Sequence, residues 1–304
     1  AHVSWGSEMC IRDSYKPMEN LVVMVRQPER EGLTAPTEQE IVDALKAAVE
    51  ADVEPFEDNV VKEPLIGEDV ELKGSPVKKE KVNEALGTTE WTLKNGIKVV
   101  FKQTPYEADR VSLSAESYGG SALFDNDMFY SASMLPSVMS MSGISKFSAS
   151  DLNKQLSGKV ASAGTSVGSY KHGVSGSSSV KDVETMLQLV YLQFTAPRFN
   201  EDDFATLMKR YNTMLANQMS NPDFLFRQKL VKTLYGDNFR RQQITPELLE
   251  KVKLEQMPEA HSRLFSNAAD FSFRIIGNID AATLKPLVEK YIGSLPAAKK
   301  PTNK

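Results

Sequence analysis

Apolar side chains recur at helical spacing through the second half of the chain, and the strongest pattern ends before Pro197. Its apolar positions are Val183, Met186, Leu187, Val190, Tyr191 and Phe194. The same spacing predicts helices over 204–215, 254–265 and 280–291, and an apolar helix over 128–141 that contains Pro136. Ser148 is the expected N-cap of a short helix that reaches Leu156. The chain is therefore rich in helices with one apolar face each.

One more helix begins at Asn221-Pro222 and ends near Gly236, which is a typical C-terminal residue. Its apolar face is formed by Phe226, Leu230, Thr233 and Leu234.

Other segments have the alternation and residue types of strands. Trp91–Leu93 and Ile97–Lys102 flank the turn signal Asn95-Gly96, which predicts a hairpin. Val111–Glu116 and Phe271–Ile276 are single strands, and 158–180 predicts two strands of small residues. Consecutive hairpins favour antiparallel pairing. We predict an α+β fold with a mostly antiparallel sheet and helices packed on one face.

The first part of the chain has a different character. Asn20–Arg26 predicts a buried strand, and Thr37–Val49 predicts a short helix with a capping box between Thr37 and Glu40. Asp52–Glu84 is charged and rich in Pro and Gly, which is typical of a linker. We expect a non-native leader over 1–14, because EMCIRDS resembles a translated sequencing adapter. The remaining divisions are the end of a preceding domain (15–30), a linker with a short helix (31–86), one domain (87–296) and the next linker (297–304).

Composition excludes several functions. With 36 basic and 40 acidic residues the chain has a formal charge of −4, which is unsuited to a phosphate backbone or an anionic membrane surface. No apolar run reaches the ~20 residues that span a bilayer. Cys10 is the only cysteine, so an intramolecular disulfide and a zinc ribbon are excluded, although the compartment stays open.

Candidate chemistry is sparse. The histidines are His2, His172 and His261, and no two have the spacing that places two zinc ligands on one helix face. We interpret His172 as a surface or hydrogen-bonded histidine of a strand, and His261 as a non-catalytic residue of a polar helix. Glu201-Asp202-Asp203 is typical of a helix start, and Arg240-Arg241 of a solvated loop.

The glycines of the small-residue strands have two interpretations. Gly158-Lys159 is not followed by the Ser or Thr that a phosphate loop needs, so a phosphate site is rejected. Gly164, Gly168, Gly173 and Gly176 either allow close packing of strands or line a peptide cleft.

Three segments together resemble the pitrilysin/insulinase family of zinc metallopeptidases, the inverted zincins related to the mitochondrial processing peptidase. They are TLKNGIKVVFKQ (92–103), FSFRIIGNID (271–280) and LKPLVEKYIGSLP (284–296). The resemblance extends over about 87–296. It implies an α+β unit, repeated in two halves that enclose a peptide.

Active domains of this family carry H-x-x-E-H on the first long helix, and the corresponding stretch here is SASMLPSVM (131–139). Ser133 and Ser137 then stand at the histidine positions and Pro136 at the glutamate. The family's third ligand, a glutamate, falls within 204–220, which contains no Asp or Glu. Serine is a poor zinc ligand and proline has no carboxylate. The resemblance therefore implies a non-catalytic domain without catalytic, cofactor or metal residues of its own.

The function that the resemblance implies is an expectation with an alternative. The domain would form part of a peptide-enclosing chamber and interdomain contacts in a zinc peptidase whose other half holds the zinc. Its partners would be a peptide substrate and other domains of the same chain, and a periplasmic or envelope location is favoured by the resemblance. The alternative is an inactive structural or peptide-binding homologue. An H-x-x-E-H motif elsewhere in the protein would distinguish the two.

Overall fold

The structure, a computed structural model, describes residues 22–26, 34–50, 63–298 and 302. The chain divides into two compact units, Ala1–Asn59 and Val60–Lys304. The predicted leader over 1–14 lies outside the described residues, as do His2 and Cys10.

The first unit contains helix α2 (Glu38–Glu50). The predicted capping box is confirmed, because the Thr37 hydroxyl accepts from the Glu40 N–H (3.3 Å) while the Glu40 carboxylate accepts from the Thr37 N–H (2.7 Å). The strand prediction is wrong for its described part. Residues 22–26 belong to no strand and their side chains are exposed. An apolar run needs a pairing strand to form a sheet, and no described residue pairs with it.

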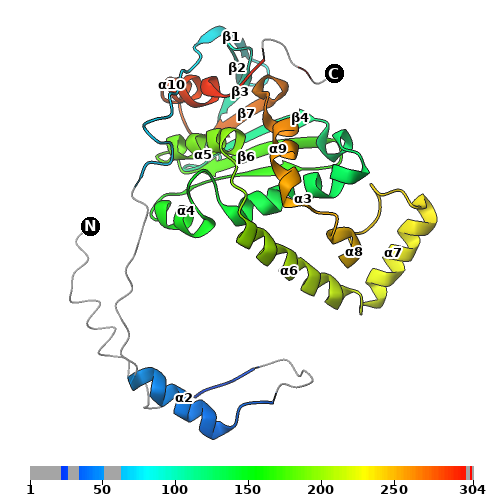
Figure 1. Cartoon of the computed structure of the whole chain (residues 1–304). Coiled ribbons are helices and arrows are strands. Elements are labelled where there is room, and N and C mark those ends of the chain that lie inside the picture. Colours follow the sequence, from blue (N-terminus) through cyan, green and yellow to red (C-terminus); the bar gives the residue numbers. More distant parts are fainter. Residues whose placement is uncertain (1–21, 27–33, 51–62, 299–301, 303–304) are drawn as a thin grey trace. The chain divides into compact units, whose positions relative to one another are not determined.

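The second unit is built on a seven-stranded sheet with the order β1-β2-β3-β7-β4-β6-β5 (Figure 1). The strands are β1 (Val77–Asn83), β2 (Thr88–Leu93), β3 (Lys98–Gln103), β4 (Val111–Tyr118), β5 (Ala161–Val167), β6 (Lys171–Ser178) and β7 (Ser272–Gly277). All neighbours are antiparallel except β3 and β7. Gly96, with φ of 93°, occupies the tight turn between β2 and β3. The predicted hairpin is confirmed.

The helices of this unit are α3 (Asn126–Ser142), α4 (Ala149–Gln155), α5 (Val183–Thr195), α6 (Glu201–Gln218), α7 (Pro222–Tyr235), α8 (Pro246–Leu249), α9 (Met257–Phe265) and α10 (Ala281–Tyr291). Helices α3 and α5 pack against the sheet, whereas α7 lies away from it (Figure 1). Alternate residues of β4 and β7 are buried, and the residues between them are half-buried or exposed. One face of the sheet therefore carries the core, and the predicted α+β fold is confirmed. None of the described helices is long and apolar enough to cross a bilayer.

The predicted linker needs a correction. Its last part forms β1, which pairs with β2, and Leu65 is buried in the core. The Ser75 N–H also donates to the Glu289 carbonyl of α10 (2.9 Å). The side chains of β1 are nearly all exposed. This segment is a strand because it pairs with β2, not because it buries one face. Its charged sequence therefore lacks the apolar alternation by which a strand is predicted.

Candidate functional site

The serines and proline at the degenerate motif positions share one face of α3. Ser133, Pro136, Ser137 and Ser140 follow at helical spacing and are exposed or half-buried, whereas the opposite face is buried in the core. The Asp125 side chain caps this helix, and Pro136 lies in its interior. The Ser133 hydroxyl donates to the Phe129 carbonyl of its own helix (2.7 Å).

Two cavities flank this face. One, of about 370 Å³, lies between α3, α4 and β5. Its lining includes Pro136, Ser140, Ala163, Gly164, Thr165 and Gln193. The other, of about 390 Å³, lies between α3 and α6 and is lined by Pro136, Ser137, Ser140, Met141, Leu207 and Tyr211. The motif face of α3 therefore forms the ridge between two hollows.

This face does not fit a zinc ion. The side-chain oxygens of Ser137 and Tyr211 lie 3.5 Å apart, so a tyrosine of α6 stands beside the second motif position. Structural and catalytic zinc sites use imidazole, thiolate or carboxylate ligands, and the face offers only neutral hydroxyl groups. Within the described parts of the chain no three His, Cys, Asp or Glu residues are placed to hold a metal. Among the described residues, this face of α3 therefore carries no carboxylate or imidazole that would activate water.

The edge strand β5 presents backbone groups that do not bond to β6 next to the 370 Å³ cavity. The carbonyl of Val160 accepts from the Ser179 N–H (2.9 Å), and the Gly168 N–H donates to the Lys171 carbonyl (2.8 Å). Hydrogen-bonding positions alternate along an antiparallel pair. Even-numbered residues of β5 therefore bond to β6, and the N–H and C=O groups of Ala161, Ala163, Thr165 and Val167 point off the free edge. An extended peptide has the complementary groups.

Gln193 of α5 links this edge to the helix layer. Its Nε2 donates to the outward carbonyl of Ala163 (3.3 Å). Its Oε1 is buried and has no partner among the described residues. A buried acceptor without a donor is costly. Gln193, which lines the cavity, therefore keeps one buried acceptor without a hydrogen bond from any described residue.

Both described histidines are buried and hydrogen-bonded. His172 of β6 accepts from the Gly120 N–H at Nδ1 (3.2 Å) and donates from Nε2 to the Leu264 carbonyl (2.7 Å). His261 of α9 donates from Nε2 to the Gln193 carbonyl (2.8 Å). Burial lowers the pKa of each imidazole, and the carbonyl partners oppose that shift only in part.

These histidines take part in packing. His172 meets Phe265 and Phe271 edge-on, and His261 stacks on Phe265. The interpretation of His172 as hydrogen-bonded agrees with this geometry, but neither residue lies on the surface. The α9 helix also buries a whole face, so the expectation of a polar helix was wrong.

The glycines of the small-residue strands fall into two groups. A Cβ at Gly173 would overlap the Ala115 carbonyl of β4, and one at Gly176 would lie 2.9 Å from Met186 Cγ. These two are required by packing. At Gly164 a Cβ would meet nothing within 4 Å, and this residue lines the 370 Å³ cavity. Packing therefore does not explain Gly164, and the peptide-cleft interpretation stays open there.

Both charged clusters lie where they were predicted. Glu201, Asp202 and Asp203 lie in the first turn of α6. Arg240 and Arg241 lie in an exposed turn after α7. The Arg240 guanidinium also donates to the carbonyls of Ser121 (3.0 Å) and Phe124 (2.5 Å) and lies over the Phe239 ring. These contacts were not predicted, because side-chain hydrogen bonds to a distant loop have no local sequence pattern.

Gln193 and Tyr211 were not predicted from the sequence. Each occupies a regular position in an amphipathic helix, and only the packing of α5 and α6 beside β5 and α3 brings them to the cavities. The sole sequence signal is a glutamine within the apolar pattern of α5.

No family model matches the chain. It is 25% identical over 285 residues to the zinc protease PQQL-like of Arabidopsis thaliana, which covers 93% of this chain and 25% of that protein. It is 24% identical over 212 residues to the probable zinc protease PqqL of Escherichia coli, covering 68% of this chain and 22% of that protein. The chain thus spans about a quarter of the length of these curated relatives.

Solved structures share the fold. The periplasmic protease PqqL from Escherichia coli superimposes with a TM-score of 0.69 at 21% identity, covering 87% of this chain and 29% of that one. The ferredoxin protease FusC, solved in complex with Arabidopsis ferredoxin, has a TM-score of 0.63 at 21% identity, covering 88% and 29%. A peptidase M16 inactive domain from Pseudomonas fluorescens has a TM-score of 0.58 at 18% identity, covering 71% and 52%.

Proposed function

This chain resembles pitrilysin-type zinc proteases in sequence and has their fold, and from this premise we propose that it is a non-catalytic segment of such a protein. In this proposal it forms one wall of a peptide-enclosing chamber, and the zinc and the hydrolysis belong to another part of the protein. The 370 Å³ cavity between α3 and the free edge of β5 is the observation that carries the proposal.

The chemistry of the wall is that of strand addition. A peptide lying along β5 would pair with the outward backbone groups of Thr165 and Val167, whereas the outward carbonyl of Ala163 already accepts from Gln193. Small side chains on β5 leave room for it. Backbone pairing provides affinity without selecting a side-chain sequence. Such a wall would hold peptides of many sequences.

The compartment and partners belong to the same proposal. A periplasmic location is supported by the similarity to the periplasmic protease PqqL of Escherichia coli, and protein substrates by the FusC complex with ferredoxin. We expect peptide to bind through this chain and the other domains of the parent protein together.

Binding is tested with Thr165→Pro in this chain. Proline removes the N–H of Thr165, which points away from β6, so no hydrogen bond to β6 is lost. Edge strands tolerate proline at such positions. Losing one peptide hydrogen bond of about 1–1.5 kcal/mol raises the Kd about tenfold. The readout is fluorescence anisotropy of a labelled peptide rich in Val and Thr.

Thr165→Ala is the matched control, because it keeps the N–H and loses only the contact of the Thr165 hydroxyl with the Met139 sulfur (3.8 Å). It is expected to change the Kd less than about threefold, which corresponds to less free energy than the loss of one hydrogen bond. A peptide that does not bind, or that binds Thr165→Pro as well as the parent chain, contradicts the proposed wall.

The non-catalytic assignment has its own test. After loading with zinc and dialysis, this chain should retain zinc at background level and cleave no peptide. Stoichiometric zinc would overturn the assignment. An H-x-x-E-H motif in the remainder of the reading frame would support an active parent protein, and its absence would favour the alternative of an inactive peptide-binding homologue.

A further inference from the structure

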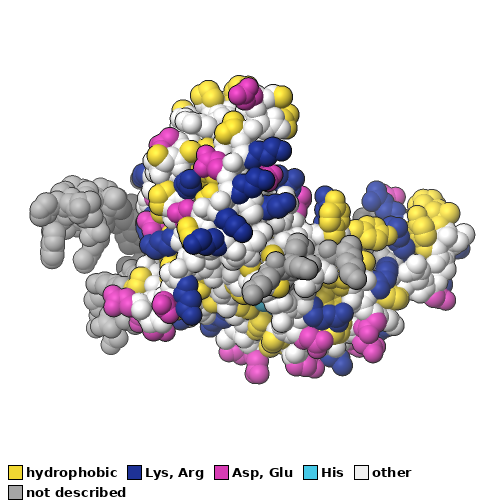
Figure 2. Space-filling model, turned by 90° about the horizontal axis from the view of Figure 1, so that it is seen from above, with side chains coloured by type: hydrophobic (Ala, Val, Ile, Leu, Met, Phe, Trp, Pro, Cys, Tyr) yellow, Lys and Arg dark blue, Asp and Glu magenta, His cyan; other side chains and the backbone are white. Residues whose placement is uncertain are grey.

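Helix α7 has an apolar stripe that faces away from its own unit. Phe226, Leu230 and Leu234 follow at i, i+4 and i+8, and they are 67%, 43% and 64% exposed. These are the residues for which the sequence predicts an apolar face, so the amphipathic pattern is real but unburied. Figure 1 shows α7 beyond the end of α6, away from the sheet, and Figure 2 shows hydrophobic side chains gathered there beside Lys and Arg.

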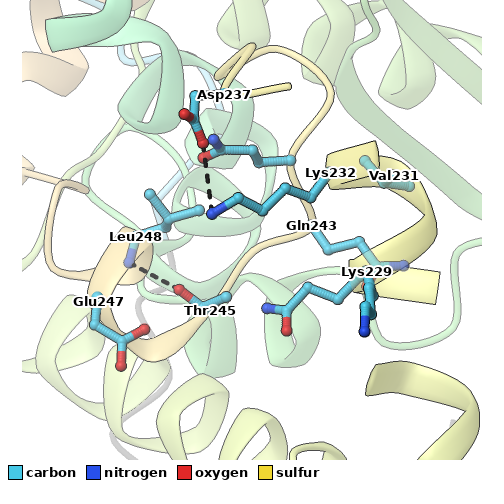
Figure 3. Close-up of a pocket in the computed structure, with 10 residues that line it drawn as sticks. Lys229, Val231, Lys232, Asp237, Gln243, Thr245, Glu247 and Leu248 are labelled. Atoms are coloured by element: carbon cyan, nitrogen blue, oxygen red, sulfur yellow. Dashed lines mark hydrogen bonds and ion pairs between the residues drawn. The ribbon is translucent and has the colours of Figure 1, made fainter. Parts of the chain in front are cut away.

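The opposite side of α7 is only loosely packed. Phe224, Gln228 and Val231 are half-buried, and no residue of the helix is fully buried. A cavity of about 460 Å³ separates α7 from the segment that leads into α8. Gln243 lines this cavity, and its Oε1 is buried without a partner in the described part of the chain (Figure 3). The unit therefore contributes little burial to α7.

The charge of α7 indicates what could cover the stripe. The helix carries three cations, Arg227, Lys229 and Lys232, against one carboxylate, Asp223, which makes a net charge of +2. Lys232 pairs with Asp237 at the helix end (3.7 Å), with both side chains largely exposed. A second copy of α7 would bring like charges together, whereas an acidic surface would be attracted.

We propose that the stripe of Phe226, Leu230 and Leu234 docks an acidic, amphipathic segment of the parent protein that lies outside this chain. This inference rests on the proposed function, in which the chain is one segment of a larger protease-like protein. The curated relatives are about four times as long as the part they share with this chain, so the parent has ample sequence to supply that segment. A buried apolar stripe rimmed by opposite charges is the usual anatomy of a helix-in-groove contact.

Hydrogen exchange of residues 222–235 tests the proposal, measured in the complete reading frame and in this chain. Exchange of α7 is expected to be at least tenfold slower in the complete protein. Leu230→Glu should abolish that protection, because it places a carboxylate against the acidic segment. Leu230→Lys should lose less of it, and Val82→Glu, which changes an exposed valine on β1 (62%), should leave it intact.

Several outcomes would overturn the docking surface. One is equal hydrogen exchange of α7 in the two proteins. Another is a Leu230→Lys effect as large as that of Leu230→Glu. A third is protection of α7 that rises with concentration in this chain alone, which would indicate a second copy. Peptide binding at β5 is measured separately on the Leu230→Glu chain, where it should be unchanged. A failure of the α7 surface is thereby distinguished from a failure of the peptide wall.

Discussion

The two buried histidines predict that the second unit loses stability in mild acid. His172 and His261 are 2% and 6% exposed, and burial lowers the pKa of both imidazoles below the ordinary value of 6.5. In the folded chain His172 accepts the Gly120 N–H at Nδ1. A proton on that nitrogen would break the hydrogen bond and place two N–H groups against each other.

The sign follows from proton binding. The unfolded chain protonates its histidines as the pH falls below about 6.5, while the buried histidines of the folded chain stay neutral. The free energy of unfolding therefore has its full value above that pH and decreases below it. For a histidine that stays neutral when folded, the loss at pH 5.5 is about 1.4 kcal/mol, and for both about 2.8 kcal/mol. Asp270, the charged group that acts on His172, opposes the shift and makes these values upper limits.

Urea unfolding at pH 7.5 and pH 5.5 measures this loss. With a slope of about 2 kcal/mol per molar, the midpoint should fall by up to about 1.4 M. His172→Gln retains a donor toward Leu264 and cannot titrate, so its midpoint should change about half as much between the two pH values. The carboxylates with lowered pKa, such as Glu184 beside the Tyr291 hydroxyl, lose their contribution only nearer pH 4 and do not disturb this window.

The reasoning is refuted if His172→Gln and His261→Gln each show the full midpoint change of the parent chain. In that case other groups would be responsible for the acid sensitivity.

Two further predictions concern packing. Phe265→Ala empties a fully buried site between His172, His261 and Phe271, and should lower the free energy of unfolding by about 3–5 kcal/mol in urea titrations, whereas an exposed aromatic changed to alanine should have little effect. Gly173→Ala should lower the free energy of unfolding by about 1–3 kcal/mol in the same titration, because its Cβ overlaps a backbone carbonyl. The matched Gly164→Ala should leave the free energy of unfolding unchanged. Equal effects at the two glycines would contradict the close approach of β6 to β4.

Much of the local structure was determined by the sequence itself. The Thr37–Glu40 capping box, the Asn95-Gly96 turn and the acidic first turn of α6 are interactions between near neighbours, so their patterns are visible along the chain. The serines and proline at the motif positions were placed by aligning this helix with the motif of the pitrilysin/insulinase family, which the sequence resembles. Their assignment as a lost catalytic motif stays a prediction, and the structure adds that they share one accessible face of α3.

Tertiary structure decided the rest, because the remaining features join residues far apart in the chain. The last strand, β7, enters the sheet between β3 and β4, and β1 is a strand only because β2 pairs with it. The same amphipathic pattern is buried in α5 and exposed in α7, since periodicity shows that a face is apolar but not what it meets. Gln193 beside the free edge of β5 is likewise a product of packing, and the candidate site was therefore only half visible in the sequence.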